Sequence, residues 1–497
     1  MYRNVLDYLN ETVKRMPEKM AFSNGTDSFT FSEIYEQSRA VGSWLHQQNI
    51  YKSPVVIFMN KHPKTVAAFL GVITGGCFYI PVDREMPDMR IELILKNTDA
   101  KIMICDQDTA ALAERLRFSG RIALYDQICG TLIQEKALKK IYDDALDIDL
   151  IYVVFTSGST GIPKGVTGCH RSVIDYIEQL SEVLGFGEDT VFGNQAPLYF
   201  DACMKEIYPT LKFGASAYLI PKDLFMFPLK LVEFLNQYRI NTLCWVVSAL
   251  TMISAFGTFE NAVPEYLRTV AFAGEVFPIK QFNRWKSTLS EVRFFNLYGP
   301  TEGTGVCCYY CVDRDFADHE VIPAGRPFKN TEIILLNEEN ERAIGSEQGE
   351  ICLRGTCLSH GYYKDPERTK EVFVQNPLNR TYPEIIYRTG DVGRYNEKGE
   401  LIFVSRKDYQ IKHMGHRIEL GEIETYVNGM QEVEMAGCIY RNEKIVLYYV
   451  GKISEREMAV AVKAKLPRYM VPNNIHRIEK MPFTPNGKID RKALYLL

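Results

Sequence analysis

Residues 151–165 read IYVVFTSGSTGIPKG, an apolar run followed by hydroxyl side chains, glycines and one lysine. The run predicts a buried strand, and the spacing of Val173, Ile177, Leu180 and Leu184 predicts a helix after the loop. Glycines let the backbone approach closely, so amides, hydroxyls and the lysine can meet phosphate oxygens. A P-loop differs, because Ser or Thr directly follows its lysine. The segment therefore predicts a nucleotide-phosphate site, with a plain surface loop as the alternative.

Short apolar runs of this kind recur along the first part of the chain. Ser53 to Met59, Ile102 to Cys105 and Thr269 to Phe272 are examples, and helix-like segments alternate with them. That alternation is typical of parallel sheets covered by helices. We therefore predict an α/β fold of stacked sheets and helices for this part.

The pattern of the chain changes from about Ala343. Gly349 to Gly355 and Gly399 to Val404 are Gly-rich and alternating, which predicts short antiparallel strands in a small barrel-like part. Mixed strands and helices are expected in the last segment. We predict a large N-terminal domain over 1–407 and a small α+β domain over 408–497.

Composition excludes several classes of function. The chain has 497 residues, of which 46% are hydrophobic and 24% are charged, enough for at least two domains. A net charge of −4 gives no basic surplus for nucleic acid. Residues 1–16 have the spacing of an amphipathic helix rather than a signal peptide, and Gly, Pro, Ser or Thr interrupt the long uncharged stretches. We expect a cytoplasmic protein without a membrane span.

The 12 cysteines are scattered through the chain. Without a secretion signal, we expect reduced thiols rather than a disulfide framework. Cys308 and Cys311 form a lone CxxC in a strand-like stretch, and His413 and His416 lie three apart. No second cysteine pair or spaced histidines completes a zinc site. We therefore expect core thiols and no metal site at these residues.

The phosphate loop is one of several ordered motifs. The others are GGCFYIP (75–81), NLYGPTE (296–302), YRTGD (387–391), LPRYMVP (466–472) and NGKID (486–490). Together they closely resemble the adenylate-forming enzymes, which include nonribosomal peptide adenylation domains, D-alanine:carrier-protein ligases, acyl-CoA synthetases and luciferases. The resemblance covers nearly the whole chain. It implies an AMP-forming ligase that uses ATP and Mg²⁺ to couple a carboxylate to AMP.

The resemblance implies roles for residues in these motifs. A carboxylate that attacks the α-phosphate is already ionised, so the step needs positioning and charge neutralisation rather than a general base. Thr156 and Glu302 are expected to be catalytic, with Glu302 also a Mg²⁺ ligand. The expected nucleotide contacts are Ser157, Thr160, Lys164, Asn296, Tyr298, Gly299, Thr301, Asp391 and Arg406. Without the context of the other motifs, Asp391 could equally be a turn residue and Tyr298 an aromatic residue of the core.

Lys488 resembles the lysine that bridges the substrate carboxylate and the α-phosphate, and an exposed turn lysine is the alternative. The resemblance also implies that the C-terminal domain is mobile and rotates about Asp408 for thiol transfer. Gly415 would then enter the site and line the route of a phosphopantetheine arm, with its basic neighbours Lys412, His413, His416 and Arg417. Met414 stands where many relatives carry arginine, which leaves the charge contacts of that state open.

Phe200-Asp201 resembles the aromatic–aspartate pair of amino-acid-activating members, whose aspartate meets the substrate ammonium group. A helix cap is the other interpretation, because residues 202–207 look helical. The family's pocket positions match Asp201, Ala202, Lys205, Trp245, Ala271, Ala273, Leu297, Gly305 and Val306. In an otherwise apolar pocket, Lys205 favours an acidic substrate side chain, unless Lys205 pairs with Glu206 or another protein carboxylate, or faces solvent.

The function predicted first is amino-acid adenylation followed by thioester transfer to the phosphopantetheine arm of a carrier protein, as in nonribosomal peptide synthesis. D-alanine:D-alanyl carrier protein ligation is the alternative, because residues 206–209 and 274–278 look like stretches of those ligases. Lys205 and Trp245 fit poorly with so small a substrate. An acyl-CoA synthetase is less expected, since its acyl pocket has no need of Asp201.

Overall fold

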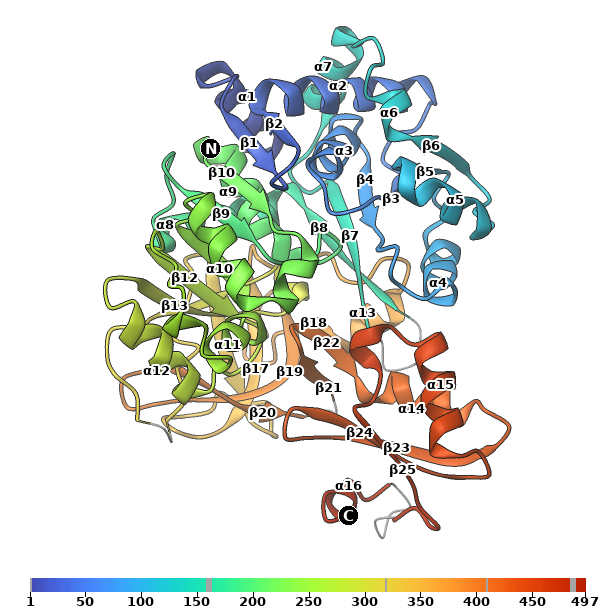
Figure 1. The fold of residues 1–497 in the computed structure, drawn as a ribbon, viewed down its shortest axis with the longest axis vertical. Coiled ribbons are helices and arrows are strands. Elements are labelled where there is room, and N and C mark those ends of the chain that lie inside the picture. The colour runs from blue at the N-terminus through green and yellow to red at the C-terminus, as the bar shows by residue number, and fades with distance from the viewer. Residues whose placement is uncertain (1, 158–162, 318–319, 408–409, 483–488) are drawn as a thin grey trace.

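The computed structural model describes residues 2–157, 163–317, 320–407, 410–482 and 489–497, and Figure 1 shows their arrangement. One sheet has the strand order β6-β5-β3-β4-β7-β8, in which β7 and β8 are antiparallel and the other pairs are parallel. Its strands are β3 (Pro54–Phe58), β4 (Phe78–Pro81), β5 (Ile102–Cys105), β6 (Arg121–Leu124), β7 (Leu150–Thr156) and β8 (Lys164–Cys169). The strand predicted before the phosphate loop is therefore confirmed as β7, and the loop joins β7 to β8.

Strand β8 lies between the loop and the helix that the sequence predicts. It escaped prediction because KGVTGC is short and rich in glycine. A Cβ on Gly168 would approach the ring of Tyr152 to 2.1 Å, so the missing side chain is what lets β8 pack on β7. The predicted helix begins directly after β8.

A second sheet has the order β15-β14-β13-β12-β11-β9-β10-β1-β2. Its strands are β1 (Met20–Ser23), β2 (Ser28–Thr30), β9 (Val191–Asn194), β10 (Ser216–Leu219), β11 (Thr242–Val246), β12 (Thr269–Ala273), β13 (Arg293–Tyr298), β14 (Cys308–Cys311) and β15 (Arg326–Pro327). Within this sheet the neighbours β13, β12, β11, β9, β10 and β1 pair in parallel. Strands β2, β14 and β15 add antiparallel edges. The CxxC stretch is a strand, as predicted, with Cys307 and Cys308 buried. Cys311 is exposed, so the expected core position is wrong for that thiol.

Helices pack on these parallel strands. They are α1 (Leu6–Arg15), α2 (Phe31–Gln47), α3 (Pro63–Thr74), α4 (Asp88–Thr98), α5 (Gln107–Arg115), α6 (Tyr125–Ile128), α7 (Glu135–Asp144), α8 (His170–Leu184), α9 (Met204–Phe213), α10 (Pro228–Gln237), α11 (Val247–Ala255) and α12 (Ile279–Thr288), with the 3-10 turns η1 (Asp201–Cys203), η2 (Lys222–Met226), η3 (Thr258–Glu260) and η4 (Thr301–Gly303). A further helix, α13 (Pro366–Val372), contacts the antiparallel sheet described below. Local chemistry sets their ends: Thr30 and Glu33 form a capping box that starts α2, and Gly185 ends α8 with a φ of 72°.

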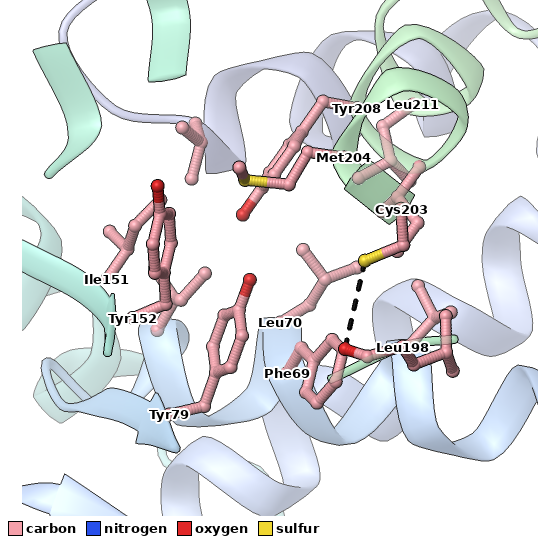
Figure 2. Close-up of a cluster of buried hydrophobic side chains, with 14 of the residues drawn as sticks. Phe69, Leu70, Tyr79, Ile151, Tyr152, Leu198, Cys203, Met204, Tyr208 and Leu211 are labelled. Atoms are coloured by element: carbon pink, nitrogen blue, oxygen red, sulfur yellow. Dashed lines mark hydrogen bonds between the residues drawn. The ribbon is translucent and has the colours of Figure 1, made fainter. Parts of the chain in front are cut away.

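A continuous buried core joins both sheets to α1–α3, α8 and α9. Figure 2 shows the part beneath η1, where the hydroxyl groups of Tyr79 and Tyr208 point toward each other. The Cys203 thiol donates to the carbonyl of Leu198 at 3.8 Å. Cys203 is the last residue of η1 and is buried in this core, so the core positions the turn that contains Asp201.

The antiparallel sheet that the sequence predicts follows. It has the order β16-β17-β19-β18, with β20 paired to β19. The strands are β16 (Thr331–Leu336), β17 (Gly349–Gly355), β18 (Phe373–Gln375), β19 (Ile385–Tyr395) and β20 (Leu401–Arg406).

The C-terminal elements lie together at one end of the molecule in Figure 1. They are β21 (Gln410–His413), β22 (His416–Glu419), α14 (Leu420–Asn428), β23 (Val433–Arg441), β24 (Lys444–Gly451), α15 (Glu455–Lys465), η5 (Arg468–Met470), β25 (Asn474–Arg477) and α16 (Arg491–Leu494). They share buried clusters of their own, to which none of the described residues before 410 contributes. Across the described ranges, no helix is both long and apolar enough to cross a membrane.

Candidate active site

Glu302 lies at the centre of the candidate site, in η4 directly after β13, and is fully buried. Oε1 accepts a hydrogen bond from the Tyr362 hydroxyl at 2.7 Å and lies 3.7 Å from Nζ of Lys164. Oε2 lies 2.7 Å from Nη1 of Arg417 in β22. Burial opposes a charge on Glu302, but Arg417 and Lys164 outweigh it and hold the pKa well below its ordinary value.

Lys164 begins β8 and pairs with Thr156 at the end of β7. Its ammonium group lies 3.7 Å from Glu302 and 3.7 Å from Glu419. Burial and the positive charge of Arg417 lower the pKa of Lys164 to about 8, although the two carboxylates oppose this shift. A polyphosphate beside this lysine would therefore favour its charged form.

The oxygen atoms around Glu302 suit Mg²⁺. Glu302 supplies a carboxylate, and Oγ1 of Thr156 is buried without a hydrogen-bond partner in the described part of the chain. No group of three or more His, Cys, Asp or Glu side chains that could hold a metal occurs among the described residues. Mg²⁺ commonly binds through one or two carboxylates together with substrate phosphates and water, which this arrangement fits.

Asp391 is the centre of the predicted nucleotide contacts. Its Oδ2 accepts a hydrogen bond from the Tyr298 hydroxyl at 2.5 Å, and its Oδ1 lies 2.5 Å from Nη1 of Arg406. Asn296 donates to the carbonyls of Ile322 and Pro323 at 3.3 and 2.8 Å. The structure thus brings Tyr298, Asp391 and Arg406 into one cluster, and Asn296, in the same strand as Tyr298, binds the neighbouring loop.

This cluster lines a cleft of about 1150 Å³ between the N-terminal sheets and the C-terminal elements. Lys412 also lines the cleft, and its ammonium group lies 5.8 Å from the centre of the Tyr298 ring. Gly299 has a packing reason for its lack of a side chain, because a Cβ there would lie 2.5 Å from Cα of Val306.

Asp201 lies in η1, between the phosphate cluster and α9. Burial raises the pKa of Asp201, whereas a hydrogen bond with the Thr301 side chain and the charge of Lys205 oppose the rise. Asp201 does not cap a helix, since the N-cap positions are Phe200 and Cys203 and neither helix has a side-chain cap. The capping interpretation is therefore wrong. Asp201 is half-buried, and a carboxylate in such a position would gain from a cationic partner.

Lys205 lies in the first turn of α9, with 4% of its surface exposed. Within the described ranges it forms no hydrogen bond or ion pair, so the interpretation that Glu206 neutralises it in an ion pair is not supported. Glu206 instead accepts a hydrogen bond from Asn194 at 3.2 Å, and its Oε1 has no partner among the described residues. Burial raises the pKa of Glu206 to about 7, against the effect of Lys205.

The strand register decides which predicted pocket residues face one another. Cys244, Ala271 and Phe295 are paired neighbours, as are Val246, Ala273 and Leu297. Ala271 and Leu297 belong to the same core as Val306, and Ala202 and Ala273 pack against it. A Cβ on Gly305 would approach the ring of Tyr176 in this core to 3.0 Å.

Trp245 lies on the opposite face of the sheet. It is fully buried in another core, packs against Phe225 and donates its indole N–H to the carbonyl of Gly193 at 2.6 Å. The prediction that Trp245 lines the same pocket is therefore wrong. Cys244 takes that place, and Lys205 and Glu206 both affect its pKa. Side chains alternate between the two faces of a strand, and this alternation along 242–246 was the sequence signal that separates Cys244 from Trp245.

The turn of the β21–β22 hairpin reaches the site. Gly415 has a φ of 77°, and its amide donates to Oε1 of Glu275 at 3.0 Å. A Cβ on Gly415 would lie 2.6 Å from Val246, so the close approach requires glycine. His416 stacks on Tyr469 and meets the edge of Phe200. Met414 is 61% exposed at the cleft.

Three predicted residues, Thr160, Asp408 and Lys488, lie outside the described residues. Sequence reasoning did not anticipate the Tyr362–Glu302 hydrogen bond, the Arg417–Glu302 ion pair or the role of Glu275 as a hairpin acceptor. These contacts join segments far apart in the chain.

Comparisons with known proteins agree with this geometry. A family model described as AMP-binding enzyme matches residues 9–363. Tyrocidine synthase 1 of Brevibacillus parabrevis is 29% identical over 505 residues, covering 99% of this chain and 45% of the synthase. The chain therefore spans less than half of that relative. The D-alanine–D-alanyl carrier protein ligase of Bacillus licheniformis is 30% identical over 506 residues, with 98% of each chain covered.

A solved adenylation domain of Vibrio cholerae, in complex with glycyl-adenosine-5′-phosphate, has a TM-score of 0.85 to this structure. The sequence identity is 22%, and the match covers 100% of this chain and 98% of that one. This likeness confirms the α/β fold with its antiparallel sheet and C-terminal part. With a family model that matches most of its length and a relative aligned over nearly all of it, the chain belongs to the AMP-binding enzyme family.

Proposed function

We propose that this enzyme activates an amino acid with ATP and transfers the aminoacyl group to the phosphopantetheine thiol of a carrier protein. The observation that supports it best is the position of Asp201, a half-buried carboxylate suited to an ammonium group, beside the Lys164–Glu302 cluster. A cytoplasmic location follows from the need for ATP and a reduced thiol.

In the first step, an oxygen of the substrate carboxylate bonds to the α-phosphorus of ATP and the bond to pyrophosphate breaks. Asp201 holds the substrate ammonium group, and Thr156, Ser157 and Lys164 hold the phosphates. Glu302 would hold Mg²⁺, which would supply positive charge to the phosphates. Thr160 and Lys488 are proposed to add phosphate and carboxylate contacts.

The nucleoside would lie at the large cleft. Asp391, held by Arg406 and Tyr298, would accept hydrogen bonds from the ribose hydroxyls. Asn296, Gly299 and Thr301 would contact the base and the phosphate side of the nucleotide.

In the second step, the carrier thiolate attacks the carbonyl carbon of the aminoacyl adenylate and AMP leaves, with the thiol proton released to solvent. The arrangement described above suits this step, because the Gly415 turn already lies beside Val246 and Glu275. We propose that residues 408–497 form a mobile domain that rotates about Asp408 between the steps. The other arrangement would bring Lys488 to the substrate carboxylate.

The proposed substrate has an acidic side chain. Lys205 is nearly inaccessible and has no ion pair in the described part of the chain. A buried ammonium group without a partner is costly, and a substrate carboxylate would remove that cost. Ala271, Ala273 and Leu297 lie on one face of the sheet.

D-alanine ligation is the second candidate. It is favoured by the carrier protein ligase of Bacillus licheniformis, which this chain matches over nearly its whole length. In that case Lys205 would be structural, and the carrier would be a D-alanyl carrier protein.

Amino-acid-dependent exchange of labelled pyrophosphate into ATP tests the proposal across L- and D-amino acids and several fatty and aryl acids. Exchange with aspartate or glutamate supports the first candidate, and preference for D-alanine supports the second. Exchange with fatty or aryl acids alone would overturn amino-acid activation.

A further inference from the structure

Both oxygen atoms of the Glu302 carboxylate are engaged in this structure. Oε1 accepts from Tyr362 at 2.7 Å, and Oε2 is paired with Nη1 of Arg417 at 2.7 Å. Glu302 is fully buried, and 15% of the Arg417 side chain is exposed. Arg417 therefore occupies the oxygen that a metal ion beside Glu302 would need.

The hairpin backbone fixes the position of Arg417. Its carbonyl accepts a hydrogen bond from the Ser157 hydroxyl at 2.7 Å, and the Gly415 amide is bound to Glu275 two residues earlier. The next residue, Ile418, is buried in the C-terminal core. Arg417 is held at its backbone on both sides, so its guanidinium group leaves Glu302 most readily when the whole hairpin moves.

Mg²⁺ binds oxygen at about 2.0–2.1 Å with near-octahedral geometry. A guanidinium group at hydrogen-bond distance from the same carboxylate would block part of that shell. Two cations would also repel each other strongly in a buried site, where solvent screens charge poorly. Lys164 lies on the Oε1 side, so the competition is for Oε2, which can meet Arg417 or the metal ion but not both.

We infer that Arg417 and Mg²⁺ occupy Glu302 alternately, so that the β21–β22 hairpin seats only after the metal ion has left. The inference rests on the proposed function, which places Mg²⁺ at Glu302. It gives Arg417 a positioning role: its charge replaces that of the metal and keeps the buried carboxylate neutralised during thiol transfer. Because linkage is reciprocal, metal binding weakens hairpin seating by the factor by which seating weakens metal binding.

Two measurements on the full-length enzyme test this exchange. Binding of Mn²⁺ with α,β-methylene-ATP is measured by electron paramagnetic resonance, and hydrogen–deuterium exchange is followed in peptides covering 410–419. In the native enzyme, the metal and the analogue together should increase exchange in 410–419. The analogue with EDTA should leave that exchange nearly unchanged.

Arg417→Gln removes the competing charge and keeps a polar side chain. The native enzyme can bind the metal only in the fraction of molecules whose Arg417 has left Glu302, which lowers its apparent affinity for Mn²⁺. This variant should therefore bind Mn²⁺ with the analogue about tenfold more tightly than the native enzyme. Exchange in 410–419 should already be high without metal. The Mn²⁺ affinity and the exchange of Arg417→Lys should lie between those of the native enzyme and Arg417→Gln. The matched control is Arg477→Gln, at an exposed position on β25, which should behave like the native enzyme. Thermal unfolding of each variant confirms that it is folded.

Equal Mn²⁺ affinity in the native and Arg417→Gln enzymes would overturn the inference, as would unchanged exchange in 410–419 when metal is added. Either result leaves amino-acid activation intact. Failure of the native enzyme to support pyrophosphate exchange with any amino acid would instead overturn the proposed function, which makes the two failures distinguishable.

Discussion

The amide of Gly415 donates to Oε1 of Glu275 at 3.0 Å, and the amide of Ser248 donates to Oε2 of the same carboxylate at 3.0 Å. Glu275 thus joins the turn of the C-terminal hairpin to the first turn of α11. A hydrogen bond to a charged group contributes about 1.5–3 kcal/mol. Loss of this carboxylate should therefore weaken hairpin seating more than the N-terminal fold.

Glu275→Ala should lower the rate of aminoacyl loading onto the carrier about tenfold, the effect of about 1.4 kcal/mol. Pyrophosphate exchange should change less than twofold, because that step does not use the seated hairpin. Single-turnover loading and exchange measure the two steps separately. Glu291→Ala, at an exposed position, is the control. A similar loss in both steps would show that Glu275 acts only through general stability.

The ion pair between Arg90 in α4 and Glu422 in α14 is a second link, with side-chain exposures of 6% and 5%. Removing one partner of a buried pair costs about 3–5 kcal/mol, because the other charge stays buried. Glu422→Gln should therefore lower the melting temperature and increase hydrogen exchange in α14. The double variant Arg90→Met/Glu422→Leu should recover most of the loss. If the losses of the single variants simply add in the double variant, the two side chains are not coupled.

Lys164 should take up a proton when nucleotide binds. Its pKa is lowered to about 8 in the free enzyme, so at about pH 9 Lys164 is neutral in most molecules. Phosphate oxygens raise that pKa toward the ordinary lysine value, and binding must then be accompanied by proton uptake. Titration calorimetry in buffers of different ionisation enthalpy measures the uptake. Lys164→Met should abolish it, and undiminished uptake in that variant would assign the proton to another group.

Lys205→Met should change the stability of the free enzyme little, since it removes the cost of burying the ammonium group together with its charge interactions with Asp201 and Glu206. The same change should raise the KM for an acidic amino acid about hundredfold, in keeping with the loss of one partner of a buried charge pair. Chemical denaturation and pyrophosphate exchange give the two values, with exposed Lys101→Met as the control. A destabilised variant with unchanged KM would make Lys205 structural.

Sequence patterns predicted the elements whose residues interact locally. The apolar run before the phosphate loop is β7, the spacing of Val173 to Leu184 is α8, and the Gly-rich alternating stretches are β17 and β20. Short strands with few apolar residues, such as β8, gave no such pattern. Their stability comes from a neighbouring strand, which the local sequence does not describe.

The candidate site was predictable only in part. The motifs indicated Lys164, Glu302, Asp391 and Arg406, and the structure brings these residues into two adjacent clusters. Trp245 was placed one residue out of register, and in a strand that error exchanges the two faces of the sheet. The Arg417–Glu302 and Gly415–Glu275 contacts depend on how the C-terminal elements sit against the N-terminal sheets, which no short stretch of sequence specifies.

The alternation along β22 constrains how this segment can vary in length. Arg417 and Glu419 face the Glu302–Lys164 cluster, whereas His416 stacks on Tyr469 and Ile418 enters the C-terminal core. Adding or deleting one residue at the Met414–Gly415 turn would exchange these faces, so that a charged residue would enter the core and an apolar one would meet the carboxylate. Related chains in which one face of β22 meets the carboxylate cluster and the other packs in the C-terminal core should therefore tolerate substitutions in this hairpin far better than single-residue insertions or deletions.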